Sequence, residues 1–277
     1  MALVPPPIPI RTTPSPLPAG NPHSSCYAVR LMTLDPLLLL QAYAIGVFPM
    51  SDDRDAQDIY WVEPKKRAIM PLDGFHLSRS LAKTIKRERF RVTTDQAFAD
   101  VVALCAQSTE DRPTTWINGA IENAYGALHD IGFAHSVECW EGEELVGGLY
   151  GVTLGRAYFG ESMFSRRTDA SKVALAWLVA RLKMAGFTLL DCQFMTEHLQ
   201  SMGATEILQN DYLALLGDAV ADVPLGFGRS VLEAGAGSAA SVAFPPEPDA
   251  DAPFAPSFSV SSPVSGHSIV QLLTQTS

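Results

Sequence analysis

Two consecutive β-patterned stretches lie near the middle of the chain, at residues 145–154 and 157–163. The Gly-Arg pair between them predicts a tight connection, so the two stretches should form a β-hairpin. Residues 173–184 follow and are apolar on nearly every helical face, which predicts a buried helix. Residues 188–192 then read as a short buried strand. A hairpin, a helix and a strand in this order predict one compact core.

Three polar residues interrupt this apolar core, at Glu161, Asp191 and Gln193. Burying a carboxylate costs several kcal/mol unless the charge is paired or used. Alternation along a strand points Asp191 and Gln193 to the same side. We therefore take these three residues as candidates for chemistry, while a strand-end carboxylate that binds backbone N–H groups remains the structural alternative for Asp191.

The flanking composition predicts four parts of an α+β protein. Residues 1–28 are rich in proline and predict a disordered leader. Residues 29–72 hold one helical stretch and short strand-like runs, which indicate a small N-terminal domain. Residues 73–217 carry alternating helices and strands around the core, and residues 218–277 change to Ala, Gly, Ser, Pro and Val, typical of a disordered or loosely packed tail.

Positive charge is concentrated in one stretch of an acidic chain. The 277 residues have a formal net charge of −10, yet residues 65–91 carry nine Lys and Arg against two acids. A helix over residues 78–87 would align four of these cations on one face: Arg79, Lys83, Lys86 and Arg87. Such a face could contact nucleic-acid phosphates. A merely solvated basic face explains the pattern equally well.

Other chemistries find little support in the sequence. The four cysteines are widely spaced and form no metal-binding pattern, so we expect reduced thiols, no metal and a cytoplasmic protein. The longest aliphatic run, residues 37–40, is too short to span a membrane, and no secretory signal is expected. Neither a dinucleotide-binding glycine motif nor a nucleophile elbow is present. A Ser162–His135–Asp191 triad has no local support.

Many short motifs nevertheless occur in the order found in one enzyme family. They include Tyr43-x-x-Gly-x-Phe-Pro, Phe75-His-x-Ser-Arg-Ser-Leu, Thr115-Trp-Ile, His135-Ser-Val-Glu, Leu145-Val-Gly-Gly-Leu-Tyr-Gly-Val, Gly160-Glu-Ser-Met-Phe-Ser, Asp169-Ala-Ser-Lys, Asp191-Cys-Gln and Ser201-Met-Gly-Ala. In these motifs the chain resembles leucyl/phenylalanyl-tRNA–protein transferases over about residues 33–216.

This resemblance implies an aminoacyltransferase. The family moves Leu, Phe or Met from charged tRNA to the α-amino group of proteins that begin with Lys or Arg, which marks them for degradation. The resemblance also implies a fold: a small N-terminal domain followed by an acetyltransferase-like mixed-sheet domain. The partners that it implies are Leu-tRNA, Phe-tRNA and proteins that begin with Lys or Arg. Because the aminoacyl ester is already activated, we expect no cofactor and no nucleophilic Ser or Cys; we also expect a monomer.

The resemblance also assigns roles to residues. Gln193 would lie beside the attacking amine, Asp191 behind it as orienter and proton acceptor, and Glu161 would hold an ammonium group. The apolar aminoacyl pocket and the site for the 3′ adenosine would be formed by Met50, Trp116, Tyr158, Met163, Leu175, Leu182 and Leu190. The basic face of Arg79, Lys83, Lys86 and Arg87 would contact tRNA.

Two departures from the family pattern and two alternatives remain. Many relatives have Trp where this chain has Met50, so adenine stacking would rest on Trp116 alone. Lys83 stands where a relative can have Arg, a smaller change. The alternatives are a non-catalytic tRNA- or peptide-binding module of the same fold, and an acyl-CoA-dependent N-acetyltransferase, for which a clear pyrophosphate loop is absent.

Overall fold

The computed structural model describes residues 24–29, 34–108, 114–221, 223 and 265–275. The order of helices and strands in these ranges is β1 (Ser24–Val29), α1 (Pro36–Ala44), β2 (Phe48–Met50), β3 (Ile59–Pro64), β4 (Lys66–Ile69), α2 (Arg79–Lys86), β5 (Arg91–Thr94), α3 (Phe98–Cys105), α4 (Gly119–Asp130), β6 (Ala134–Glu141), β7 (Glu144–Leu154), β8 (Ala157–Ser165), α5 (Ala170–Met184), β9 (Leu189–Gln193), α6 (Glu197–Ser201), β10 (Thr205–Leu208), α7 (Gln209–Ala219) and α8 (Gly266–Thr274).

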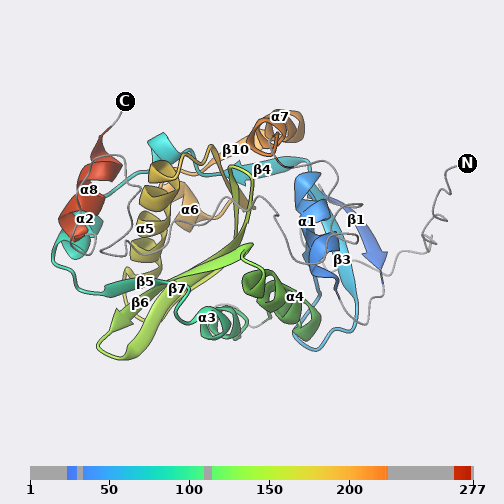
Figure 1. The fold of residues 1–277 in the computed structure, drawn as a ribbon, viewed down its shortest axis with the longest axis horizontal. Coiled ribbons are helices and arrows are strands. Elements are labelled where there is room, and N and C mark those ends of the chain that lie inside the picture. The colour runs from blue at the N-terminus through green and yellow to red at the C-terminus, as the bar shows by residue number, and fades with distance from the viewer. Residues whose placement is uncertain (1–23, 30–33, 109–113, 222, 224–264, 276–277) are drawn as a thin grey trace, which may run out of the picture.

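A seven-stranded mixed sheet organises the larger part of the molecule (Figure 1). Its strand order is β10-β4-β9-β8-β7-β6-β5, and every neighbouring pair is antiparallel except β8 and β9. Because parallel strands need a long crossover, α5 connects β8 to β9 and packs on one face of the sheet. Helices α3 and α4 contact the opposite side. The predicted α+β class with a mixed-sheet domain is thereby confirmed.

The predicted hairpin, buried helix and strand correspond to β7, β8, α5 and β9. Gly155 turns the hairpin with φ +57°, in the left-handed region where glycine carries no steric cost. Gly147 lets β7 approach the start of α5, since a Cβ atom there would lie 2.5 Å from the Cβ of Ala170. The hairpin and the helix therefore pack without a gap.

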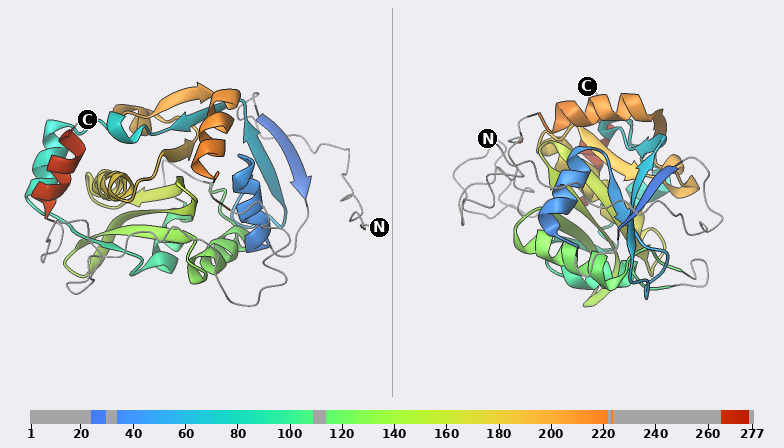
Figure 2. Two further views of the ribbon diagram at one scale, coloured as in Figure 1. Left: turned by 45° about the horizontal axis from the view of Figure 1, so that its top comes forward. Right: turned by 90° about the vertical axis from the view of Figure 1, so that its right-hand side faces the viewer.

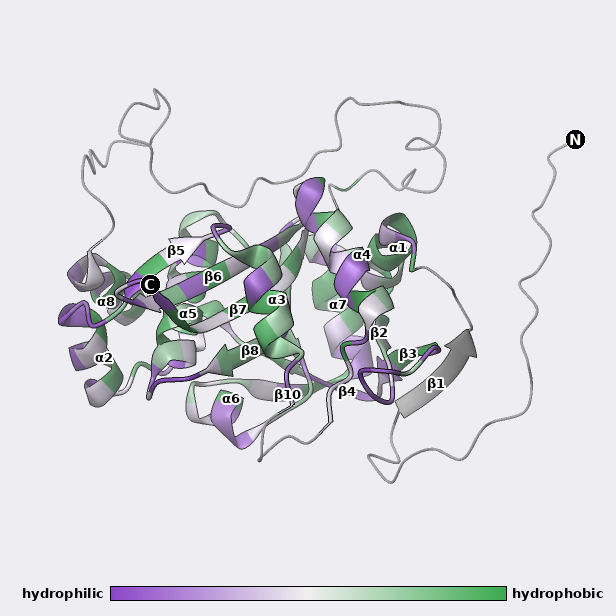
Figure 3. Cartoon of the chain, turned by 90° about the horizontal axis from the view of Figure 1, so that it is seen from below, coloured by the Kyte–Doolittle hydropathy of each residue, from purple (hydrophilic) through white to green (hydrophobic). Residues whose placement is uncertain are grey.

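Helix α5 is buried on nearly all sides, as its sequence predicted. Eleven of its 15 residues are buried, between the sheet and the elements that surround it. In Figure 3 the central strands are largely green, whereas α2 at the edge carries purple turns. None of the helices in the described ranges combines the length and the apolar character that a membrane span requires.

The N-terminal part is a smaller layer built on β1, β2, β3 and α1. The three strands form an antiparallel sheet in the order β1-β3-β2. Two expectations need correction here. Residues 24–28 of the predicted leader belong to β1, and β4, placed in the N-terminal domain by the boundary at residue 72, pairs instead with β9 and β10 of the large sheet. The rest of the leader, residues 1–23, lies outside the described residues.

The end of the chain forms a packed helix rather than the loosely packed tail that its composition suggested. Helix α8 lies beside α2 and also contacts α5 (Figure 2). Ile269, Val270 and Leu273 of α8 are buried in the same cluster as Leu81 and Ile85 of α2. Apolar residues at this spacing form one helical face, and the burial of that face explains why the segment is ordered. Most of the expected tail, residues 224–264, lies outside the described residues.

Removing apolar volume from α8 should destabilise the whole domain. Ile269 is 1% exposed, so Ile269→Ala leaves a cavity between α8 and α2 and should lower the free energy of unfolding by about 2–4 kcal/mol. Gln271→Ala changes an exposed residue of the same helix and is the matched control. Denaturant unfolding measures both variants. Equal stability of Ile269→Ala and wild type would show that α8 does not pack on α2.

Candidate active site

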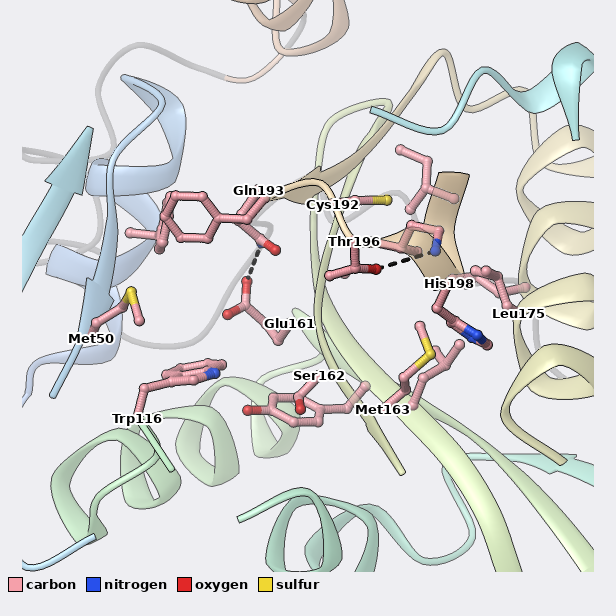
Figure 4. A pocket seen from close by; sticks show the side chains of 18 residues that line it. Met50, Trp116, Glu161, Ser162, Met163, Leu175, Cys192, Gln193, Thr196 and His198 are labelled. Atoms are coloured by element: carbon pink, nitrogen blue, oxygen red, sulfur yellow. Dashed lines mark hydrogen bonds between the residues drawn. The ribbon is translucent and has the colours of Figure 1, made fainter. Parts of the chain in front are cut away.

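An apolar cavity of about 310 Å³ opens where the large sheet meets the N-terminal layer. Residues from β2, β7, β8, β9, α5 and α6 line it, together with Trp116 before α4. Figure 4 shows Met50 and Trp116 on one side, and Met163, Leu175 and His198 on the other. Glu161 and Gln193 face each other between these two sides. The cavity thus has a polar middle between two ends whose lining is mainly apolar.

A buried ion pair supports the polar middle from behind. Arg67 is 1% exposed and Asp191 is fully buried. Nε of Arg67 lies 2.8 Å from Oδ1 of Asp191, and Nη2 lies 2.6 Å from Oδ2. Asp191 also accepts hydrogen bonds from the Tyr212 hydroxyl at 2.8 Å and from the backbone N–H of Gln193 at 2.8 Å. Such bidentate, charge-assisted contacts are stronger than neutral hydrogen bonds.

Arg67 is held from three sides. Its Nη1 donates to the Gly46 carbonyl at 3.0 Å, and its guanidinium lies 4.6 Å from the Phe48 ring centroid and 4.5 Å from that of Tyr212. Burial alone would lower the pKa of Arg67, but the charge and hydrogen bonds of Asp191 outweigh burial and raise it. Arg67 therefore stays positively charged and neutralises the buried carboxylate.

The carboxylate of Asp191 fixes the backbone of Gln193. Gln193 ends β9 with φ +55°, a left-handed conformation that costs a residue other than glycine roughly 1–3 kcal/mol. The bond from its N–H to Oδ1 of Asp191 stabilises this turn. As a result the Gln193 side chain points into the cavity, where Nε2 donates to Oε1 of Glu161 at 3.1 Å.

Glu161 on β8 is bound by two tyrosines from different helices. The Tyr43 hydroxyl of α1 donates to Oε1 at 2.7 Å, and the Tyr125 hydroxyl of α4 donates to Oε2 at 2.6 Å. Burial raises the pKa of Glu161 to about 7, although the bonds from Tyr125 and Tyr43 act in the opposite direction. This carboxyl group consequently changes charge near neutral pH.

The structure brings most of the predicted pocket residues together. Met50, Trp116, Met163, Leu175 and Leu190 all line the cavity, together with Glu161 and Gln193. Leu149 and Leu178, which the sequence analysis did not name, also line it.

Three predicted residues lie outside the cavity lining. Tyr158 is fully buried and its hydroxyl donates to the His135 carbonyl at 3.2 Å. Leu182 is fully buried in the core cluster around α5. Asp191 lies behind Gln193, because the ion pair with Arg67 turns its carboxylate away from the cavity. Tyr158 and Leu182 pack in the core, and Asp191 supports Gln193.

Sequence reasoning missed three residues that shape the site. Arg67 was only counted among the nine cations of residues 65–91, yet it is buried. Tyr43 belongs to a recognised motif but was given no part in the chemistry, and Tyr125 was not singled out. The signal for Arg67 was its place in an apolar strand opposite a buried acid, but the pairing of β4 with β9 cannot be read from local sequence.

The predicted basic face exists on α2. Ser78 caps this helix, and Leu81 and Ile85 are buried beneath it. Arg79, Lys83, Lys86 and Arg87 are exposed, and no acidic side chain in the described ranges forms an ion pair with them. Helix α2 lies at the end of the molecule opposite β1 and α1 (Figure 1).

The fold and the site define a mixed α/β protein with an apolar cavity around a polar centre. Comparison with known protein families then identifies the family of the chain. Residues 69–217 match the leucyl/phenylalanyl-tRNA protein transferase family, and residues 32–65 match the N-terminal domain of that family. The chain therefore belongs to the leucyl/phenylalanyl-tRNA–protein transferase family and is an aminoacyltransferase, as its sequence motifs predicted.

Two relatives of the same family name agree with this assignment. The leucyl/phenylalanyl-tRNA–protein transferase of Rhizorhabdus wittichii is 60% identical over 255 residues, which cover 89% of this chain and 100% of the relative. The enzyme of the same name from Zymomonas mobilis is 65% identical over 187 residues, 68% of this chain and 70% of that protein. Among solved structures, FemX aligns with a TM-score of 0.43 and 12% identity over 64% of this chain and 70% of FemX.

Breaking the buried ion pair should cost far more stability than breaking a surface pair beside it. Arg67→Met leaves Asp191 buried without its counter-charge, so the free energy of unfolding should fall by about 3–5 kcal/mol. Lys66→Ala removes the exposed pair with Glu206, 3.4 Å apart, and should cost about 1 kcal/mol or less. Urea unfolding compares the two. Similar losses for both variants would contradict a structural role for the pair.

Proposed function

We propose that this enzyme transfers Leu, Phe or Met from the 3′ end of charged tRNA to the α-amino group of proteins that begin with Lys or Arg, and that the transfer marks those proteins for degradation. The observation that carries this proposal is the apolar cavity beside the paired side chains of Glu161 and Gln193. The enzyme acts as a cytoplasmic monomer and uses aminoacyl-tRNA as co-substrate, with no further cofactor.

The apolar walls select the amino acid. Leu149, Met163, Leu175, Leu178 and Leu190 offer no partner for a charged side chain, which would lose several kcal/mol on entering. The same walls separate Leu, Phe and Met poorly, because one methylene more or less is worth only about 1–3 kcal/mol. A mixed specificity for large unbranched or γ-branched apolar residues follows.

The other end of the cavity suits the terminal adenosine. Trp116 offers an aromatic surface on which a base stacks, worth about 1–3 kcal/mol. Met50 lies across from it and supplies a flexible, polarizable contact rather than a second ring. The adenine is therefore stacked on one side only, and the ester bond falls between the two ends, near Glu161 and Gln193.

Catalysis then depends on alignment more than on a covalent intermediate. The aminoacyl ester is already activated, and holding an amine against its carbonyl can supply up to about 7–11 kcal/mol. Gln193 provides an amide at that position, and the ion pair of Asp191 with Arg67 keeps it there. In this scheme Asp191 acts as an orienting residue.

A transfer assay tests the proposal. We expect labelled Leu to pass from Leu-tRNA to peptides that begin with Arg or Lys, and not to the same peptides beginning with Ala. In Gln193→Asn the amide withdraws by one methylene while Asn still tolerates the left-handed backbone. The transfer rate should therefore fall about 100-fold with unchanged tRNA affinity. Binding without transfer by the wild type would favour the non-catalytic module, and transfer to every peptide alike would refute the acceptor specificity.

The basic face of α2 should contribute to tRNA binding through phosphate contacts. The double variant Lys83→Ala/Arg87→Ala should weaken binding of all charged tRNAs alike, and should flatten the plot of log affinity against log salt by about one unit per lost contact or somewhat less. Thr84→Ala changes an uncharged residue of the same helix and is the control. An unchanged slope would show that the face is only solvated.

A further inference from the structure

Three side chains form a closed ring of oxygen contacts beside the cavity. The hydroxyls of Tyr43 and Tyr125 lie 2.6 Å apart, and each also contacts one carboxylate oxygen of Glu161, at 2.7 and 2.6 Å. Each of these separations is a hydrogen-bond distance for oxygen atoms. The ring therefore contains three contacts: tyrosine to tyrosine, and each tyrosine to the carboxyl group.

The number of protons decides how many contacts of this ring can be hydrogen bonds in each charge state of Glu161. Each tyrosine hydroxyl has one proton to donate, and an ionised carboxylate has none. With Glu161 ionised, both protons go to the carboxylate, and the two phenol oxygens face each other at 2.6 Å without a proton between them. One more proton on the carboxyl group gives three protons for three contacts. The ring can thus take up a proton on Glu161 with a hydrogen bond in each of its three contacts.

We propose that Glu161 is the proton acceptor of the transfer reaction, and that Tyr43 and Tyr125 are positioning residues that complete a closed hydrogen-bond ring when the proton arrives. This inference rests on the proposed function. It assigns to Glu161 the proton transfer that the family resemblance gave to Asp191, and it assigns roles to two tyrosines that had none.

The surroundings of the two carboxylates support this division. Asp191 accepts bonds from Arg67, Tyr212 and the backbone of Gln193, and it does not line the cavity. A permanent positive charge against it opposes protonation. Glu161 lines the cavity and touches the Gln193 amide, so it is within reach of an amine bound there.

The reaction balances with Glu161 in this role. As the amine nitrogen forms its bond to the ester carbonyl carbon, it loses one proton to Glu161. As the bond from that carbon to the ribose 3′-oxygen breaks, Glu161 returns the proton to the departing oxygen. The products are an amide and a tRNA with a free 3′-hydroxyl, and Glu161 ends the cycle ionised.

The titration of Glu161 agrees with the ring. Burial raises the pKa of Glu161 to about 7, near the value that suits a general base at neutral pH. The titratable groups that face it or its tyrosines are Tyr43 of α1, Arg67 of β4, Tyr125 of α4, Tyr150 of β7, Tyr158 of β8, Asp191 of β9 and Tyr212 of α7. Hydrogen bonds from Tyr125 and Tyr43 favour the ionised form, so loss of either should raise the pKa further.

The pH dependence of the transfer rate tests the proposal. The rate should rise with pH as Glu161 loses its proton, with a midpoint near 7 in the wild type. In Tyr125→Phe and in Tyr43→Phe this midpoint should move upward by about one pH unit, since one charge-assisted bond to the carboxylate is lost. In Glu161→Gln the same limb should disappear and the rate at pH 8 should fall at least about 100-fold.

Two controls separate this outcome from a general loss of structure. Thr153→Val removes another buried hydroxyl bond, from Oγ1 to the Phe133 carbonyl at 3.2 Å, and should leave the midpoint unchanged. The acceptor α-amine also titrates, with a pKa of about 7.7–8.0, but its contribution is the same in every variant. The affinity for charged tRNA, measured for each variant, verifies that the protein is folded.

The results discriminate between the two proposals. Failure of the wild type to transfer Leu would overturn the proposed function itself. A wild type that transfers Leu, combined with a Glu161→Gln variant within threefold of its rate, would overturn only the role of Glu161. Unmoved midpoints in both tyrosine variants would remove Tyr43 and Tyr125 from the mechanism.

Discussion

The buried pair of Arg67 and Asp191 is the interaction on which the site depends. Two opposite charges without solvent must be paired and hydrogen-bonded on all sides, and the fold meets this requirement with groups from four segments. Arg67 comes from β4, Asp191 from β9, Tyr212 from α7, and the Gly46 carbonyl from the turn before β2. Satisfying one ion pair therefore fixes how the N-terminal layer meets the large sheet.

From this pair a continuous set of hydrogen bonds leads to the cavity. Asp191 holds the backbone of Gln193, the Gln193 amide contacts Glu161, and Glu161 binds Tyr43 and Tyr125. Each of these polar groups is held in place by a hydrogen bond to the previous one. The cavity walls on either side of them are mainly apolar. This arrangement suits a reaction whose substrate is already activated and needs alignment and one proton transfer.

The sequence predicted what depends on local pattern. Alternating hydrophobicity, a helix that is apolar all round and a Gly-Arg turn were sufficient to predict β7, β8, α5 and β9. The spacing of the cations was sufficient to predict the exposed face of α2. Contacts between segments far apart in the chain could not be predicted from local sequence. The burial of Arg67 follows from the register of β4 against β9, and the meeting of Tyr43 with Tyr125 from the packing of α1 on α4. Helix α8 did carry a signal, its apolar Ile269, Val270 and Leu273, which the surrounding Ala- and Ser-rich composition obscured.

The most direct test of this account is a crystal structure with a non-hydrolysable amide analogue of 3′-leucyl-adenosine. The account predicts the leucyl side chain among Leu149, Met163 and Leu175, the adenine against Trp116, and the amide group next to Glu161 and Gln193. An analogue bound outside this cavity, or bound with its leucyl group at Trp116, would contradict it.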